Sequence, residues 1–447
     1  MGGAGTQDHL RMGRRRSTYA YFPEPDRATV PVIRGLGLLV GLLLAVSGQS
    51  QNLTYARYLL DTLCSPHFAG RGYVDNGLQK AADFIAFQLD SLGVEPLNEV
   101  RFQPFQHPVN IFRRPVSVQI DGLALTPGRD FHMHPNSPSF SGHLSVIQLD
   151  TSYIDRPGDI IITGEAVYVL HPVSPYNRDG ASKRAGILRE LAAWVPVIDP
   201  VDKLTWSVGT SVFKQPVIEV NRETVNWQQA ETVVLSVEST FEEEFTSQNV
   251  MGVVRGTGTS DSLLVITAHY DHLGKMGNVL FPGANDNASG TAMMLDLARH
   301  YRQNPPEYTV LFLAFAGEEA GLVGSRYFVD NPLVTLEKIR FLMNLDLVGT
   351  GEDGITVVNG KTFPEAAERL AQINKEHELV PKIKVRGEAA NSDHYWFSKN
   401  GVPAFFIYTL GERTAYHDMY DVPETIGFDG YEGLFSLVVK FLEREGG

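Results

Sequence analysis

Apolar residues recur at helical spacing near the start of the chain. Between residues 78 and 92 they fall every three or four positions, which predicts an amphipathic helix, and residues 56–63 follow the same pattern. The intervening Phe68–Gly72 stretch, with two glycines, predicts a loop.

The pattern changes between about residues 109 and 235. Short β-rich runs alternate with turn residues, and a helical stretch at 182–193 lies among them. The predicted strands are 116–120, 144–149, 159–162, 166–170 and 217–220. This alternation of short strands and turns predicts a separate β-rich or mixed module inserted into the first domain.

From residue 249 onward, apolar strand-like runs alternate with helical patterns. The predicted strands are 263–267, 309–315, 341–345, 355–358 and 404–408; the predicted helices are 290–302, 322–328, 364–376 and 431–443. Apolar strands separated by helices are typical of a mostly parallel sheet covered on both faces. We therefore expect an α/β fold with an inserted β-rich module, divided into residues 1–48 (leader), 49–108 and 246–447 (main domain) and 109–245 (insert).

The apolar run 35–47 follows Arg34 and is shorter than the roughly 20 residues of a membrane span. It suits the hydrophobic region of a signal peptide, with Ala45 and Ser47 as small residues for cleavage. We expect a secreted or periplasmic protein without stable membrane insertion after cleavage; the alternative is an uncleaved N-terminal anchor.

Composition is that of a globular protein, with 43% hydrophobic and 20% charged residues. The net charge of -14 argues against general affinity for nucleic acid or anionic membranes. Cys64 is the single cysteine, so no intrachain disulfide can form, and we expect it to be a small buried residue. The oligomeric state is not predicted.

Polar residues that could carry chemistry follow the predicted strands, and ligands of such sheets bind beyond the carboxyl ends of the strands. His269 and Asp271 come directly after the run 263–267. Asp271 is suited to orient a ligating His269, although this pair alone is more typical of a loop histidine beside a solvated acid.

Asp286 lies in a small-residue loop just before the helix 290–302. Acidic and amide residues there are often helix caps, but Asn287 or Ser289 could take that role and leave Asp286 free to bridge metals. Glu318 and Glu319 come shortly after the run 309–315. Adjacent side chains in an extended segment point apart, so one could ligate a metal while the other contacts a bound water. The alternative is an acidic helix start favoured by the helix dipole.

Asp346 ends the run 341–345, and His417 lies in the loop after 404–408. Together these motifs supply two histidines and three carboxylates without a thiolate, which suits catalytic zinc with open positions for water. Two divalent ions and a bridging hydroxide would balance the three carboxylates.

The order HxD, GANDNASG, AGEE, NLD and a C-terminal YH resembles the co-catalytic zinc aminopeptidases of peptidase family M28. The resemblance covers about 249–421, more weakly 63–93, and implies two zinc ions. It implies His269 and Asp346 on one zinc, Glu319 and His417 on the other, and Asp286 bridging. It also implies Glu318 as general base and Asp271 as the residue that orients His269.

Two further features bear on this resemblance. Asp418 stands where family members often have Thr, which concerns the loop near the second zinc, while Ser392-Asp393-His394 is similar to a supporting motif. The insert resembles a protease-associated domain.

We therefore expect hydrolysis of peptide substrates, led by aminopeptidase activity, with a zinc-activated water and Glu318 as base. A carboxypeptidase or glutaminyl cyclase on the same scaffold is the alternative. A non-catalytic binding protein on a peptidase fold is the third hypothesis.

Overall fold

The computed structural model describes residues 52–446, except 155, 157, 159, 171–177, 413 and 414. The predicted leader lies outside the described residues. The domain boundaries given above remain predictions.

An eight-stranded central sheet has the order β1-β10-β14-β11-β15-β18-β16-β17. The strands are β1 Phe102–Ile111, β10 Thr240–Val254, β11 Leu263–His269, β14 Thr309–Phe315, β15 Ile339–Leu345, β16 Gly354–Val358, β17 Ile383–Val385 and β18 Ala404–Leu410. Its central block, β14-β11-β15-β18, is entirely parallel. β1, β10 and β16 add antiparallel pairings. The strands of the block are almost wholly apolar because both faces are covered.

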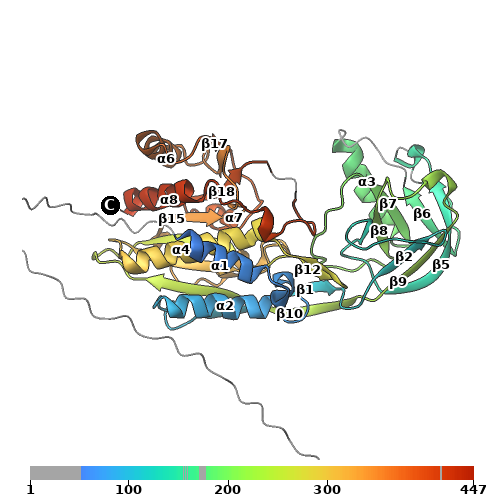
Figure 1. The fold of residues 1–447 in the computed structure, drawn as a ribbon, viewed down its shortest axis with the longest axis horizontal. Helices are drawn as coiled ribbons and strands as arrows, with labels where there is room; N and C mark the ends of the chain where they lie inside the picture. Colours follow the sequence, from blue (N-terminus) through green and yellow to red (C-terminus); the bar gives the residue numbers. More distant parts are fainter. Residues whose placement is uncertain are drawn as a thin grey trace, which may run out of the picture. The chain divides into compact units, whose positions relative to one another are not determined.

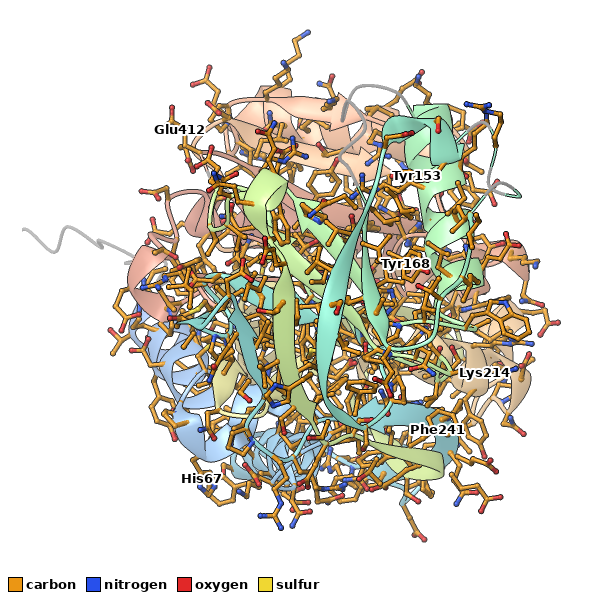
Figure 2. All side chains as sticks on the ribbon, turned by 90° about the vertical axis from the view of Figure 1, so that its right-hand side faces the viewer. His67, Tyr153, Tyr168, Lys214, Phe241 and Glu412 are labelled. Carbon is orange, nitrogen blue, oxygen red and sulfur yellow. The ribbon has the colours of Figure 1, made fainter. Side chains whose placement is uncertain are left out.

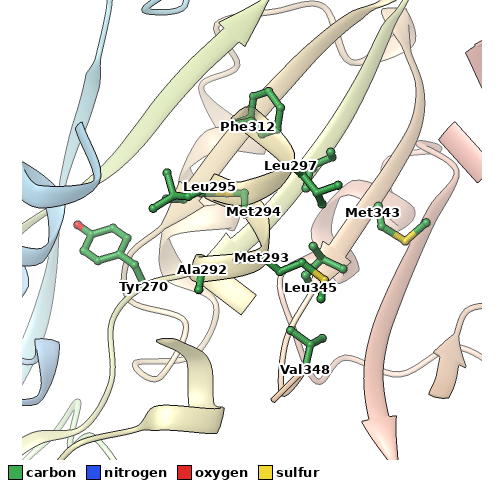
Figure 3. Packing of buried hydrophobic residues seen from close by; sticks show 14 of the residues in the cluster. Tyr270, Ala292, Met293, Met294, Leu295, Leu297, Phe312, Met343, Leu345 and Val348 are labelled. Atoms are coloured by element: carbon green, nitrogen blue, oxygen red, sulfur yellow. The ribbon is translucent and has the colours of Figure 1, made fainter. Parts of the chain in front are cut away.

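Alternate side chains of these strands enter two different cores. On one face, Leu264 and Ile266 of β11 join a cluster with apolar residues of α1, α2, α4, α6 and α8. These helices are α1 Leu53–Leu63, α2 Gly77–Ser91, α4 Gly290–Gln303, α6 Pro364–His377 and α8 Tyr431–Gly446. On the other face, Val265 packs with α5 Val323–Asp330 and α7 His394–Lys399. Figure 1 shows the helices along the sheet, and Figure 3 shows Met293, Met294 and Leu297 of α4 packed near Met343 and Leu345 of β15.

A second eight-stranded sheet has the order β3-β2-β9-β5-β6-β7-β8-β4. Its strands are β2 Ser117–Ile120, β3 Leu123–Ala124, β4 Phe131–Met133, β5 Phe140–Leu149, β6 Ala166–Leu170, β7 Val197–Val201, β8 Val217–Asn221 and β9 Thr232–Val237. The strands β5 to β8 are parallel, and α3 Arg178–Leu191 makes the crossover from β6 to β7. Tyr168 of β6, labelled in Figure 2, is fully buried in the core shared with α3. The expected α/β fold with an inserted β-rich, mixed module is thus confirmed.

A short hairpin joins the two sheets in space. It consists of β12 Gly274–Met276 and β13 Val279–Phe281, which pair antiparallel after the end of β11. Met276 and Phe281 are fully buried and belong to the core of the second sheet. The hairpin, which follows the carboxyl end of β11, therefore packs against the inserted module.

Two local expectations differ from the structure. Residues 160–162 form no strand, and 159 lies outside the described residues. Ile161 is 80% exposed, so its β-forming side chain has no neighbouring strand to pack on. The segment expected as a loop at 68–72 lies mostly within a 3-10 helix, Pro66–Arg71. Cys64 is buried, as expected.

Within the described part of the chain, no helix is both long and apolar enough to cross a membrane.

Candidate metal centre

His269 is the last residue of β11, and its ring is 1% exposed. Nδ1 lies 3.2 Å from the backbone carbonyl oxygen of Asp271 and 3.7 Å from Oδ1 of the Asp271 carboxylate. The carboxylate also accepts the backbone N–H groups of Glu318 and Glu319, at 3.2 and 3.3 Å. Asp271 therefore ties the loop after β11 to the loop after β14.

Asp286 lies in the turn between β13 and α4. Ser289 is the N-cap residue of α4 but makes no side-chain capping bond, whereas Asn287 Oδ1 accepts the backbone N–H of Gly290, the first residue of the helix, at 2.9 Å. The backbone N–H of Asp286 donates to Asp421 at 3.0 Å. With its backbone held in this way, the carboxylate of Asp286 is free to face the histidines.

Glu318 and Glu319 follow the end of β14 and turn to different partners. Glu319 Oε2 lies 3.2 Å from His417 Nε2. Glu318 instead groups with His269 and Asp346, with potential ligand atoms within 4.8 Å of one another. The two neighbouring carboxylates thus lie near different residues of the cluster, Glu319 near His417 and Glu318 near His269 and Asp346.

Asp346 follows β15 and is 5% exposed. Its Oδ2 accepts the Ser392 hydroxyl at 2.8 Å. The Ser392 oxygen accepts Asn344 Nδ2 at 2.7 Å, and Thr267 donates to Asn344 Oδ1 at 2.7 Å. This buried chain of hydrogen bonds sets the carboxylate of Asp346 and gives Ser392 a supporting contact.

His417 lies in the loop after β18 with a positive φ of 53°. The ring of Tyr416 stacks on it, with centroids 4.0 Å apart. The hydroxyl of Tyr408, in β18, accepts a hydrogen bond from Arg386 Nη1 at 3.0 Å. The loop thus brings the second histidine to the cluster from a distant part of the chain.

The five predicted ligands converge in space. Asp286 Oδ1 lies 3.4 Å from His269 Nε2, and Asp286 Oδ2 lies 3.1 Å from His417 Nε2. Asp346 Oδ1 is 3.3 Å from His269 Nε2. Tetrahedral ligands at zinc distances of about 2.0–2.1 Å stand roughly 3.3 Å apart, so the spacing of these donor atoms fits a metal such as zinc. Two groups of residues could each hold a metal ion, with potential ligand atoms within 4.8 Å of one another: His269, Glu318 and Asp346, and His272, Asp286 and Glu319.

Electrostatics support the same interpretation. Burial opposes charge on His417, but Glu319 and Asp286 outweigh it and raise its pKa to about 11. Burial likewise opposes charge on His269, yet Asp346 and Glu318 hold its pKa well above the usual value. The carboxylates thus favour positive charge within the cluster. In addition, Asp346 Oδ1 is buried without a hydrogen-bond donor among the described residues. Divalent cations bound at the cluster would supply that positive charge.

Two residues of the site were not predicted. His272 is fully buried, and its Nδ1 lies 2.8 Å from Glu319 Oε1. Arg71 is also fully buried and donates to the carbonyl oxygens of Tyr270, Gly283 and Asp286, at 2.9, 2.7 and 3.3 Å. The His in HYDH and the Arg between two glycines were the available sequence signals, but their partners lie far away along the chain.

Part of the chain matches a known family model, and segments of it align with curated proteins. Residues 249–442 match the profile described as peptidase family M28. Aminopeptidase YwaD of Bacillus subtilis is 31% identical over 186 residues, which cover 40% of this chain and 39% of YwaD. The probable lipoprotein aminopeptidase LpqL of Mycobacterium tuberculosis is 25% identical over 75% of this chain and 69% of its own length. The chain therefore spans well under two thirds of YwaD.

Solved structures resemble the chain over most of its length. The zinc aminopeptidase BSAP from Bacillus subtilis superimposes with a TM-score of 0.66 at 20% identity, covering 88% of this chain and 94% of that one. The peptidase M28 precursor from Shewanella amazonensis gives 0.67 at 16% identity, over 88% and 93% of the two chains. At these identities the likenesses show that the chain shares the fold of these structures.

Proposed function

We propose that this chain is a zinc-dependent aminopeptidase that removes N-terminal residues from peptides, with two zinc ions per chain. One observation carries the proposal. The two carboxylate oxygens of Asp286 face different histidines, Oδ1 toward His269 and Oδ2 toward His417. A carboxylate that serves two imidazoles in this way suits a bridging ligand between two metals.

The proposed ligands divide into two groups. His269 and Asp346 would hold one zinc, Glu319 and His417 the other, and Asp286 would contact both. When bound, zinc polarises the peptide carbonyl and lowers the pKa of water to about 7. His272 and Ser392 would hold Glu319 and Asp346 in their ligating orientations.

Glu318 is the proposed general base. It lies beside His269 and Asp346, and its backbone N–H donates to Asp271 at 3.2 Å, which holds the residue in place. In the reaction, Glu318 takes the proton of the attacking water and returns it to the leaving amine as the C–N bond breaks. Asp271 thereby positions both the base and His269.

The aminopeptidase assignment is supported by the pocket and by the relatives. An acidic, metal-lined pocket suits the free α-amine of a substrate, and proteins that align with this chain include aminopeptidases. A carboxypeptidase or a glutaminyl cyclase would keep the same ligands with a different pocket. Aminoacyl peptides and N-blocked peptides, assayed with and without chelator, separate these cases, and cleavage of blocked peptides at internal bonds would refute the aminopeptidase assignment.

Glu318→Gln tests the mechanism. The variant is expected to keep both zinc ions and to lose turnover by at least about 100-fold, because the amide accepts no proton. The matched control is Glu388→Gln, at an exposed position, which is expected to behave as wild type. Near-normal turnover by Glu318→Gln would remove this residue from the base role.

The inserted segment 109–245 is proposed as a protease-associated-like domain, and the apolar run 35–47 as a signal for secretion or export to the periplasm. Expression with its own leader, followed by N-terminal sequencing of the mature protein, tests the export. An intact leader on cytoplasmic protein would contradict it.

A further inference from the structure

A residue of the inserted segment contacts the loop that carries His417. The backbone N–H of Trp206 donates to the backbone carbonyl oxygen of His417 at 2.7 Å. Trp206 lies between β7 and β8 of the second sheet, whereas His417 follows the last strand of the central sheet. A main-chain hydrogen bond thus links the insert directly to a proposed zinc ligand.

Trp206 is held firmly enough to act as a support. It is 5% exposed, and its indole Nε1 donates to the carbonyl oxygen of Met133 at 2.8 Å. Its ring stacks on Phe281, with centroids 4.8 Å apart and planes 20° apart. Phe281 ends β13, two residues before the loop of Asp286, so the indole packs beside the approach to a second proposed ligand.

The His417 loop depends on such support. His417 has a left-handed backbone, which is uncommon for a residue with a side chain and persists where surrounding contacts hold it. Two neighbours also reach the insert. Asp418 Oδ2 lies 3.7 Å from Lys203 Nζ, and Met419 packs against the core of the second sheet.

We propose that Trp206 is a positioning residue through which the insert holds His417 in its ligating position. This inference rests on the proposed function, because it takes His417 as a zinc ligand. Its thermodynamic consequence is reciprocal. If the Trp206 contact favours zinc at the His417 position, zinc must favour the Trp206 contact to the same degree.

Hydrogen exchange of the unaltered protein tests the coupling without a mutation. The amide of Trp206 is expected to exchange at least about tenfold more slowly with zinc than with chelator, because opening of this bond then requires loss of the ligand. The amide of Tyr168, bonded to Pro196 within the second sheet, is the internal control. An equal change at both amides, or none at Trp206, would overturn the inference.

A variant pair supplies the second readout. Trp206→Ala is expected to weaken one of the two zinc ions by about 10- to 100-fold in competition with a chelator, and to recover turnover at saturating zinc. Trp206→Phe keeps a ring against Phe281 and is expected to lie between Trp206→Ala and wild type. Trp194→Ala is the matched control, because Trp194 is also in the insert but is 64% exposed.

The outcomes separate this inference from the proposed function. Two zinc ions of wild-type affinity in a folded Trp206→Ala protein would overturn the inference alone. A wild-type protein that binds two zinc ions but cleaves no peptide would overturn the proposed activity, while the exchange and affinity measurements still decide the role of Trp206. A wild-type protein that binds no zinc would overturn both.

Discussion

His272 Nδ1 lies 2.8 Å from Oε1 of Glu319, and the imidazole is completely buried. The ring packs directly on Gly283, where a Cβ atom would come within 2.3 Å of it. Gly283 also has a positive φ of 58°, so both space and backbone favour glycine at this position. With Oε1 engaged by His272, Oε2 of Glu319 is the oxygen that faces His417.

Removal of that imidazole should loosen a ligand. His272→Ala is expected to weaken one zinc ion by about 10- to 100-fold, as substitutions of residues that orient metal ligands commonly do. Competition with a chelator measures the effect. His377→Ala, at an exposed position at the end of α6, is the control and should bind zinc as wild type does. Unchanged zinc affinity in His272→Ala would show that Glu319 needs no such support.

Arg71 joins the first helices to the metal loops. Its guanidinium is buried and donates to carbonyl groups on both sides of the site, including those of Pro282 and Gly283 at 2.6 and 2.7 Å. Arg71→Met leaves these carbonyls without donors, so a loss of at least about 3 kcal/mol in the free energy of unfolding is expected by urea titration. Arg255→Met removes an exposed pair with Glu95 and should cost less than about 1 kcal/mol. Equal stabilities of the two variants would contradict the role of Arg71.

Ser392 orients Asp346 through the hydroxyl bond of 2.8 Å. Ser392→Ala is expected to lower kcat/KM by about tenfold, which corresponds to about 1.4 kcal/mol, the size of a hydrogen bond to a charged group. The fold should persist, since the change removes one oxygen atom. Ser236→Ala, at an exposed position of β9, is the matched control. A wild-type kcat/KM for Ser392→Ala would leave Asp346 oriented by its backbone alone.

Glu219 of β8 should make the stability of the protein depend on pH. Burial raises the pKa of its carboxyl from 4.5 to about 7. The folded protein therefore binds a proton that the unfolded chain has released between those pH values, and stability falls as pH rises through this window. Glu219→Gln carries no ionisable group there, so it should gain up to about 3 kcal/mol relative to wild type at pH 8 and nothing at pH 4.

Denaturant unfolding at the two pH values measures this difference. Glu165→Gln, at an exposed position in the same module, is the control and should shift stability little at either pH. A gain for Glu219→Gln that is the same at pH 4 and pH 8 would mean that packing, rather than ionisation, causes it.

Much of the fold and of the candidate site could be predicted from local patterns. The strands β11, β14, β15 and β18 are buried on both faces and are therefore apolar runs that a sequence displays directly. Three of them have proposed metal-site residues at or just beyond their carboxyl ends, namely His269, Glu319 and Asp346. Because parallel strands end at one edge, that order alone predicted that these side chains would converge.

The run at 159–162 shows the limit of this reasoning. Its isoleucines have the β propensity of a strand, but residues 160–162 lie outside every sheet of the described chain. A strand forms only where a neighbour supplies its hydrogen bonds, and no local pattern reveals whether that neighbour exists.

The sequence by itself determined the alternation of strands and helices and the chemical types in the cluster, because these follow from hydrophobic spacing and from residues next to strand ends. Only the tertiary structure decided that His272 turns Glu319 toward His417, that Arg71 holds the Gly283–Asp286 turn, and that Trp206 of the insert contacts His417. Each of these relationships depends on hydrogen bonds between segments far apart along the chain. Tertiary packing brings these distant segments together, and no local or periodic pattern of the sequence records which residues then meet.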